Sequence, residues 1–217
     1  MLPLDESNSI GALAINLPLD IIATVLDITI VGWSYVVSSG KVSVSSYETE
    51  IAGHLGREMT AEKNRRLGLK NQIRIEEEVG TRSSPTSDKP EGRIDIKIIY
   101  SFDESEYFGM ECKRVTSKNK QLAKKYVDQG VMRFVTAKYS ADHDWAAMLG
   151  FVLDGNSDGS INLICNQLSK QSQETCMEED WAIDNHFGAT VNLYGTRHRQ
   201  KGRNFLFRLL HLFLVIP

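Results

Sequence analysis

Three side chains in the middle of the chain have the types and spacing that hydrolysis of a phosphodiester needs. Asp95 lies in residues 92–100 and Glu111 in residues 107–115, and both segments alternate apolar and polar residues as a β-strand does. Two carboxylates on neighbouring strands repel each other unless a hard cation lies between them, and Mg²⁺ prefers such oxygen ligands. Lys113 points from the same strand face as Glu111, so its ammonium could orient a water or offset charge on a phosphate. The three residues therefore predict metal-dependent phosphodiester hydrolysis.

The residues between the two segments predict how the segments meet. Residues 103–106 are Asp-Glu-Ser-Glu, a short polar insert of the kind that closes a β-hairpin. A hairpin sets its strands side by side, so Asp95 and Glu111 are expected at one site. The alternative is an edge strand whose alternating charges are merely solvated.

At these residues the chain resembles the PD-(D/E)xK nuclease superfamily, which has the restriction-endonuclease-like fold. Asp95 matches the first motif acid, and Glu111, Cys112 and Lys113 match the second motif, whereas Ile94 stands where the family's name has proline. The resemblance implies an α/β fold with a central mixed β-sheet flanked by helices. It also implies that Asp95, Glu111 and the main-chain carbonyl of Cys112 bind Mg²⁺, for which Mn²⁺ substitutes, and that Lys113 assists cleavage of DNA.

Two further acids are candidates for the same metal. The pattern predicts a helix that starts at Ser45, with Glu48 three residues later as a capping box. The resemblance implies that the helix before the motif strands contributes an acid. Glu50 is the first candidate because it borders the apolar stripe, and Glu48 is the second. Residues 71–79 alternate as a strand does, and Glu78 is the candidate there.

The segment after Lys113 has helical periodicity over residues 117–139. Gln129 and Arg133 lie one turn apart on it, and the resemblance implies a glutamine or basic residue near the scissile phosphate, which makes Gln129 a catalytic candidate. Residues 113–138 hold eight Lys or Arg against one acid, in a chain of net charge −3, as expected of a local phosphate-binding face. The predicted nucleic-acid contacts here are Arg114, Lys118, Lys120, Lys124, Lys125 and Arg133.

A second basic stretch lies near the C-terminus. Residues 197–208 hold five Lys or Arg and no acid, and they run into the hydrophobic residues 205–216. Basic side chains beside an apolar anchor are typical of a phosphate clamp. Arg197, His198 and Arg199 are therefore predicted nucleic-acid contacts, with a solvated face as the alternative.

Composition indicates the class of protein. A chain of 217 residues is long enough for one sizeable core, which we divide into an N-terminal element, residues 1–44, that packs on the core or a partner, and a nuclease-like domain, residues 45–217. Residues 21–37 are apolar, but Asp27 interrupts them and they fall short of the ~20 residues of a membrane span. Three cysteines without a CxxC pair argue against disulfides and structural zinc, and no lysine precedes Lys41, which argues against a signal peptide. We expect a cytoplasmic protein without a membrane span.

These patterns together predict a Mg²⁺-dependent DNA endonuclease. A homodimer or a component of a larger defence complex is expected, because cleaving both strands takes two active sites, and an anti-phage or restriction role follows by analogy alone. One alternative is a nuclease-fold module that binds nucleic acid or a partner without catalysis. Another is an HD-type metal phosphohydrolase built on His143 and Asp144 with His54 and Asp184, although such enzymes are all-helical and this chain has several strand patterns.

Overall fold

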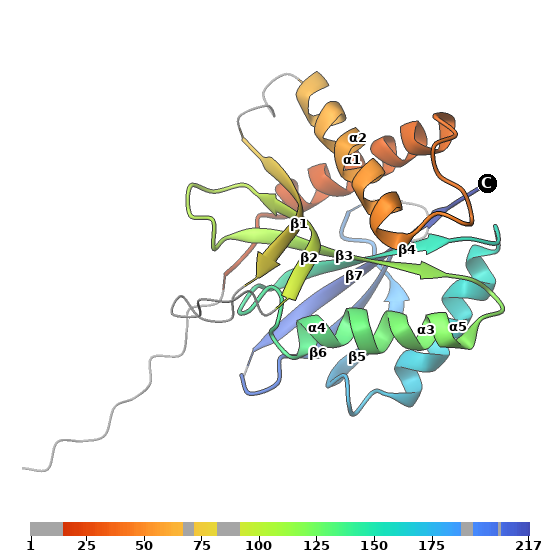
Figure 1. Cartoon of the computed structure of the whole chain (residues 1–217). Helices are drawn as coiled ribbons and strands as arrows, with labels where there is room; N and C mark the ends of the chain where they lie inside the picture. Colours follow the sequence, from red (N-terminus) through yellow and green to blue (C-terminus); the bar gives the residue numbers. More distant parts are fainter. Residues whose placement is uncertain (1–14, 67–71, 82–91, 188–192, 204) are drawn as a thin grey trace, which may run out of the picture.

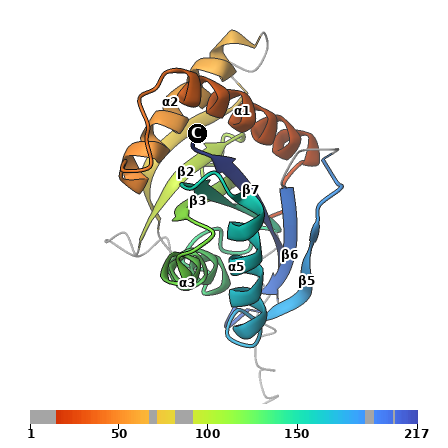
Figure 2. The ribbon, with the colours of Figure 1, turned by 90° about the vertical axis from the view of Figure 1, so that its right-hand side faces the viewer.

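A seven-stranded mixed β-sheet crosses the molecule, and helices cover both of its faces (Figures 1 and 2). The computed structural model describes residues 15–66, 72–81, 92–187, 193–203 and 205–217, and the structural statements below concern those residues. The helical elements are α1 (Leu19–Ser38), α2 (Glu48–Arg65), α3 (Lys120–Tyr126), the π-helical turn η1 (Val127–Val131), α4 (Met132–Val135) and α5 (Ser157–Lys170). The strands are β1 (Arg74–Thr81), β2 (Gly92–Ile99), β3 (Tyr107–Val115), β4 (Trp145–Val152), β5 (Met177–Ile183), β6 (Leu193–Arg199) and β7 (Leu206–Val215).

The strand order is β1-β2-β3-β4-β7-β6-β5. β4 pairs in parallel with both β3 and β7, whereas the other neighbouring strands are antiparallel. After Trp145, β4 is buried at every position, as expected of a parallel strand that is covered on both faces. The α/β architecture with a mixed sheet between helices, which the sequence predicts, is confirmed.

β2 and β3 form the predicted hairpin. Ile96 pairs with Met110 and Ile99 with Tyr107 in antiparallel register. The turn is closed by the backbone N–H of Glu106, which donates to the carbonyl of residue 103 at 3.0 Å. The alternation of the two segments therefore places the motif residues on adjacent strands.

α1 and α2 form the helical layer on one face of the sheet (Figure 1). Ile22 and Leu26 of α1 share a buried cluster with Leu55 of α2 and with apolar residues of β2 and β3. The helices pack so closely that a Cβ on Gly32 would lie 3.1 Å from the Met59 nitrogen. Among the described residues α1 alone is long and apolar enough for a membrane span, but 44% of that stretch is buried inside the protein. Its apolar character is accounted for by this packing.

α3, η1, α4 and α5 cover the opposite face. Tyr126 and Phe134 are fully buried there in a second cluster with β4 and β7. The single helix predicted over residues 117–139 is instead three pieces, because a π-helical turn separates α3 from α4. Gly130 lies in that turn against the sheet, where a Cβ would come within 2.3 Å of Met148 Cε. A larger residue at this position would require the flexible Met148 side chain to shift, and π-turns of this kind occur often at functional sites.

Two local expectations are corrected by the structure. α2 begins at Glu48 rather than at Ser45, and its capping interaction runs from the Tyr47 backbone N–H to Glu50 Oε2 at 3.3 Å. β5 is not predicted by the sequence, because its residues 177–183 are mostly exposed and include three consecutive acids instead of alternating apolar and polar residues. This edge strand forms through its pairing with β6, so tertiary contact overrides weak local preference.

Candidate active site

The predicted trio meets on the β2–β3 hairpin. The backbone N–H of Cys112 donates to Asp95 Oδ2 at 2.7 Å, which holds that carboxylate across the two strands. Lys113 Nζ donates to Glu111 Oε1 and to the Cys112 carbonyl, each at 2.6 Å. Glu111 is fully buried, and Lys113 is 6% exposed. The structure thus brings the two acids, the carbonyl and the ammonium together.

A third carboxylate joins them from the first turn of α2. Glu48 Oε1 accepts a hydrogen bond from Lys113 Nζ at 2.9 Å, and Glu48 Oε2 accepts one from the backbone N–H of Arg114 at 3.0 Å. The Arg114 guanidinium donates to the Ser46 carbonyl at 3.0 Å, which fastens the loop before α2 to β3. Glu50, the first candidate from the sequence, caps its own helix instead. The later start of α2 explains why Glu48 takes this place.

Arg133 reaches the same acids from the opposite helical layer. Its Nη1 donates to Glu111 Oε1 at 2.5 Å and to the Tyr139 hydroxyl at 2.8 Å. The Tyr139 hydroxyl donates in turn to the Arg93 carbonyl on β2. We call the set of Asp95, Glu111, the Cys112 carbonyl, Lys113, Glu48 and Arg133 the Glu111 cluster. It joins both helical layers to the central hairpin.

One oxygen of Glu111 has no partner. Oε1 takes both cations, whereas Oε2 is buried and makes no hydrogen bond with any described residue. An unpaired buried acceptor costs about 1–3 kcal/mol. Burial and the negative charge of Asp95 raise the pKa of Glu111 to about 8, despite Lys113 and Arg133. The two cations therefore do not hold Glu111 fully ionised at neutral pH, and no hydrogen-bond donor among the described residues reaches its Oε2.

The neighbouring pKa values follow from the same balance. Burial raises the pKa of Asp95, although the charge of Lys113 and the Cys112 N–H oppose the shift. Burial alone would lower the pKa of Lys113, but Glu111, Glu48 and Asp95 together raise it above its ordinary value. Lys113 is therefore an ammonium at neutral pH, and it can donate a hydrogen bond but cannot accept a proton.

A hollow of about 270 Å³ opens beside Lys113. Among the residues that line it are Glu48, Arg114, Lys125 and Gln129, which come from α2, β3, α3 and η1. Gln129 and Lys125 are exposed, so their polar ends are accessible from solvent. The structure thus places the catalytic candidate Gln129 and two predicted nucleic-acid contacts at the mouth of the Glu111 cluster.

Other predicted residues lie outside the cluster. Glu78 on the edge strand β1 is half exposed, and its carboxylate lies 3.6 Å from Arg93. Lys118, Lys120 and Lys124 are exposed at and just before α3, and Lys124 pairs with an acid one turn later. None of these residues makes a recorded contact with the acids of the cluster within the described ranges.

For the predicted C-terminal phosphate clamp, the structure corrects the role of His198. His198 is fully buried on β6, because the two-residue period of the strand points it inward. Its flanking arginines pair with acids of β5, Arg197 with Glu179 at 2.8 Å and Arg199 with Glu178 at 3.0 Å. These side chains are engaged within the protein at the sheet edge opposite β1.

β6 and β7 carry a second buried polar cluster, which the sequence does not predict. His211 Nδ1 lies 2.9 Å from the Tyr126 hydroxyl, and its Nε2 lies 2.8 Å from Thr196 Oγ1. Thr196 Oγ1 also lies 2.7 Å from His198 Nε2, and His198 Nδ1 lies 2.9 Å from the Thr175 carbonyl. Neutral rings, each with one donor and one acceptor, satisfy this whole chain. Burial lowers the pKa of His198 to about 4 and that of His211 well below its ordinary value. We call this chain of Tyr126, His211, Thr196, His198 and the Thr175 carbonyl the Thr196 network.

The residues of the HD alternative are dispersed. His143 is buried, and its Nδ1 contacts the Ala141 carbonyl at 2.8 Å. Asp184 pairs with Arg208 at 3.0 Å beside β6 and β7. Across the described parts of the chain, no group of three or more His, Cys, Asp or Glu side chains is arranged to hold a metal. That includes the Glu111 cluster, in which two carboxylates bond to Lys113.

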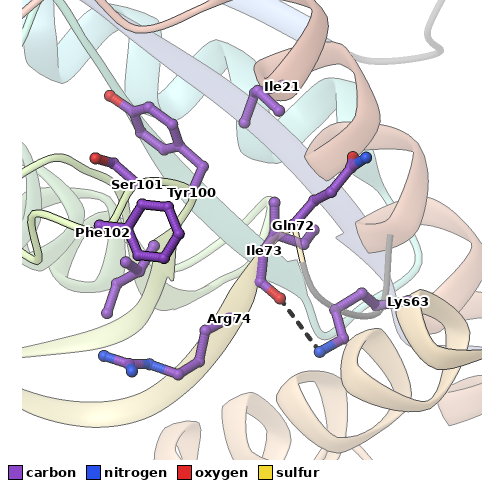
Figure 3. Close-up of a pocket in the computed structure, with 9 residues that line it drawn as sticks. Ile21, Lys63, Gln72, Ile73, Arg74, Tyr100, Ser101 and Phe102 are labelled. Atoms are coloured by element: carbon purple, nitrogen blue, oxygen red, sulfur yellow. Dashed lines mark hydrogen bonds between the residues drawn. The ribbon is translucent and has the colours of Figure 1, made fainter. Parts of the chain in front are cut away.

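A larger and more apolar hollow of about 760 Å³ lies between α1, the end of α2 and the strands β1 and β2 (Figure 3). Ile21 and Phe102 contribute apolar walls. Lys63 Nζ donates to the Ile73 carbonyl at 3.2 Å, and Arg74 pairs with two acids. Both cations at this hollow are already bonded within the protein, so it indicates no particular ligand.

Comparisons of the chain with protein-family models, with curated proteins and with solved structures found no match. The interpretation of the Glu111 cluster therefore depends on its geometry and on the sequence motif. The sequence favours Glu50 over Glu48 and gives no indication of Tyr139. Tyr139 contacts Arg133 only because the chain turns back at Ala137, whose φ is 54°, and the local sequence pattern does not predict that turn.

Proposed function

We propose that the protein is a Mg²⁺-dependent endonuclease that hydrolyses phosphodiester bonds of DNA, with a restriction-endonuclease-like core. One observation carries the proposal: side chains of α2 and α4 converge on Glu111 and Lys113 of β3 beside Asp95 of β2, and Glu111 Oε2 still has no partner among the described residues. Buried polar atoms are normally paired. An unpaired carboxylate oxygen next to a second carboxylate is what a hard divalent cation would occupy.

The donor set fits Mg²⁺. Asp95, Glu111 and the Cys112 carbonyl would hold the ion, with Glu48 as a further oxygen beside Lys113. A bound Mg²⁺ would activate water and neutralise charge on the phosphate. Mg²⁺ keeps several waters when one or two carboxylates bind it. Mn²⁺ takes the same oxygen ligands, so we expect it to substitute.

Lys113 acts as a donor. Its raised pKa keeps it protonated, so it orients a water or stabilises negative charge that develops on the phosphate, and it is not the general base. Glu48 holds the ammonium and the backbone of Arg114 together. This bridge fixes the end of β3 against α2 and sets the position of Lys113.

The substrate phosphate is bound by residues at the mouth of the Glu111 cluster. Arg133 keeps about a third of its side chain exposed while it contacts Glu111, and its remaining N–H groups suit phosphate oxygens. Gln129, one turn earlier, adds an amide donor at the mouth of the cluster. We therefore assign these two residues to the scissile phosphate.

One observation favours a second function, a nuclease-fold module that binds nucleic acid or a partner without catalysis. Lys113 and Arg133 both contact Glu111 Oε1, so the buried carboxylate has two cationic partners without a metal. Such a module would bind its target equally well in EDTA. It would also keep its function after Glu111→Gln.

Cleavage of supercoiled plasmid separates the two functions. Purified wild type and Lys113→Ala are incubated with plasmid in Mg²⁺, in Mn²⁺ and in EDTA. We expect nicking or linearisation by the wild type only with metal, and its loss in the variant. Linear product without a nicked intermediate would support paired active sites, as in the homodimer or larger complex that we propose.

A matched pair of variants on α2 controls for indirect effects. Glu48→Gln removes a carboxylate that bonds to Lys113, whereas Glu50→Gln makes the same change at a helix cap two residues away. We expect slower cleavage from the first and unchanged cleavage from the second. Cleavage that survives Lys113→Ala contradicts the site, and a wild type that binds DNA but never cleaves it supports the binding module.

A further inference from the structure

Besides the hollow next to Lys113, a second hollow, of about 580 Å³, adjoins the Glu111 cluster, because Arg133 of that cluster lines it. Gln129 lines both this hollow and the smaller one beside Lys113. Arg133 belongs to the second hollow and Lys113 to the first, and both contact the same oxygen, Glu111 Oε1. The two hollows therefore share Gln129, and a lining residue of each contacts the buried Glu111.

The second hollow carries an excess of positive charge. Arg133, Lys138 and Lys201 line it, and neither lysine has an ion-pair partner among the described residues. Of the two acids in the lining, Asp128 is neutralised by Lys124 and also accepts a hydrogen bond from Gln171. Because Arg133 is itself paired with the buried Glu111, the remaining charges in this lining are those of the two lysines and of Glu174.

The two lysines stand on backbone that the fold holds in place. The N–H of Lys201 donates to the Val135 carbonyl at 2.7 Å, which ties the β6–β7 turn to the end of α4. The N–H of Lys138 donates to the Arg133 carbonyl at 2.9 Å. It follows Ala137, a buried residue with a positive φ of 54°, a conformation that costs energy outside glycine. The positions of both lysines are thus built into the fold.

We propose that Lys138 and Lys201 continue the DNA-binding site as a phosphate track on one side of the scissile phosphate, with Lys125 and Arg114 on the other. The track rests on the proposed function and specifies where the strand runs. Lys125 lies near the end of α3 and Arg133 in α4, on the two sides of the π-helical turn that carries Gln129. The track therefore contacts phosphates on both sides of the cleaved bond.

Fluorescence anisotropy of a labelled 20-base-pair DNA duplex in EDTA tests the track without cleavage. Full-length wild type is compared with the double variant Lys138→Gln and Lys201→Gln. Each lost phosphate contact lowers the slope of log K against log salt by about 0.9, which at 0.1 M salt is roughly eightfold in affinity. We expect the double variant to bind roughly 60-fold more weakly, with a slope smaller by about 1.8.

The control double variant is Arg197→Gln and Arg199→Gln, which removes the same charge from β6. We expect it to bind DNA as the wild type does. Unchanged affinity and slope in the Lys138 and Lys201 variant would overturn the track alone, as would a loss confined to the β6 variant. A wild type that binds no DNA, either in EDTA or in Mg²⁺, would overturn the proposed function together with the track.

Discussion

The Glu111 cluster and the Thr196 network are both buried polar clusters beneath the α3–η1–α4 segment, and they differ in how their atoms are satisfied. Arg133 reaches the first and Tyr126 the second. The first holds three carboxylates and two cations, and one Glu111 oxygen is unpaired. The second is a chain of neutral groups in which each ring nitrogen has a partner.

This contrast indicates which buried polar groups only stabilise the fold. A fully paired neutral network rigidifies a core and needs nothing from outside it. A buried carboxylate with an unpaired oxygen costs stability, and a bound ion, a water or a catalytic role is among the explanations for such a group. We therefore expect variants of the Glu111 cluster to change activity and variants of the Thr196 network to change stability.

The largest expected effect is on catalysis. Glu111→Gln removes a proposed metal ligand and should slow metal-dependent plasmid cleavage by about 10²–10³-fold, the size of one lost electrostatic contact to a transition state. Thr196→Val should leave the rate per folded molecule unchanged. Initial rates, normalised to folded protein by circular dichroism, measure both. An equal loss in the two variants would abolish the distinction between the clusters.

The next effect is on folding. Thr196→Val removes the hydroxyl between His198 and His211 and leaves two buried nitrogens unpaired, which should cost about 2–4 kcal/mol. Thr136→Val makes the same change at an exposed site. It is the control, and it should lower the free energy of unfolding by less than about 1 kcal/mol. Urea unfolding gives both values. Similar values for the two variants would show that the network does not stabilise the fold.

The pH dependence of stability should have opposite signs in the two clusters. The pKa of Glu111 is raised from 4.5 to about 8, so the folded state holds its proton more tightly and stability is lost as pH rises through that range. The pKa of His198 is lowered from 6.5 to about 4, so stability is lost as pH falls through that range. Each proton contributes a slope of about 1.4 kcal/mol per pH unit.

Urea unfolding from pH 4 to pH 9 resolves the two limbs. Between pH 4.5 and 6.5 the two slopes offset each other, so the wild type should show the loss due to Glu111 alone between pH 6.5 and 8. Glu111→Gln should abolish that loss and steepen the rise of stability with pH between 4.5 and 6.5. A variant whose stability still falls between pH 6.5 and 8 would contradict the assignment of the raised pKa to Glu111.

Much of the Glu111 cluster is predictable because strand alternation is a local property. The alternation around Asp95 and the spacing of Glu111 and Lys113 on one strand require only the neighbouring residues. The choice between Glu48 and Glu50 is different. It depends on where α2 starts, and contacts from Arg114 on a distant strand help to set that start.

The basic stretch at residues 197–199 shows the opposite case. The sequence Arg-His-Arg predicts a solvent-facing cationic surface, but β6 is an inner strand whose neighbour β5 has little strand character of its own. Burial of His198 and pairing of the arginines depend on that distant strand. Lys201, just beyond β6, gains its position from a contact to α4. Long-range pairing of this kind leaves no local pattern.

Direct binding of Mg²⁺ in the absence of DNA tests the central claim, that Glu111 Oε2 is kept for a divalent cation. Isothermal titration at pH 8 compares the wild type, Glu111→Gln and Thr196→Val. For a Kd of about 1 mM, 10 mM Mg²⁺ also stabilises the fold by about 1.4 kcal/mol. We predict binding to the wild type and to Thr196→Val, and its loss in Glu111→Gln. Binding that survives Glu111→Gln, or a wild type that binds no Mg²⁺, would contradict the account.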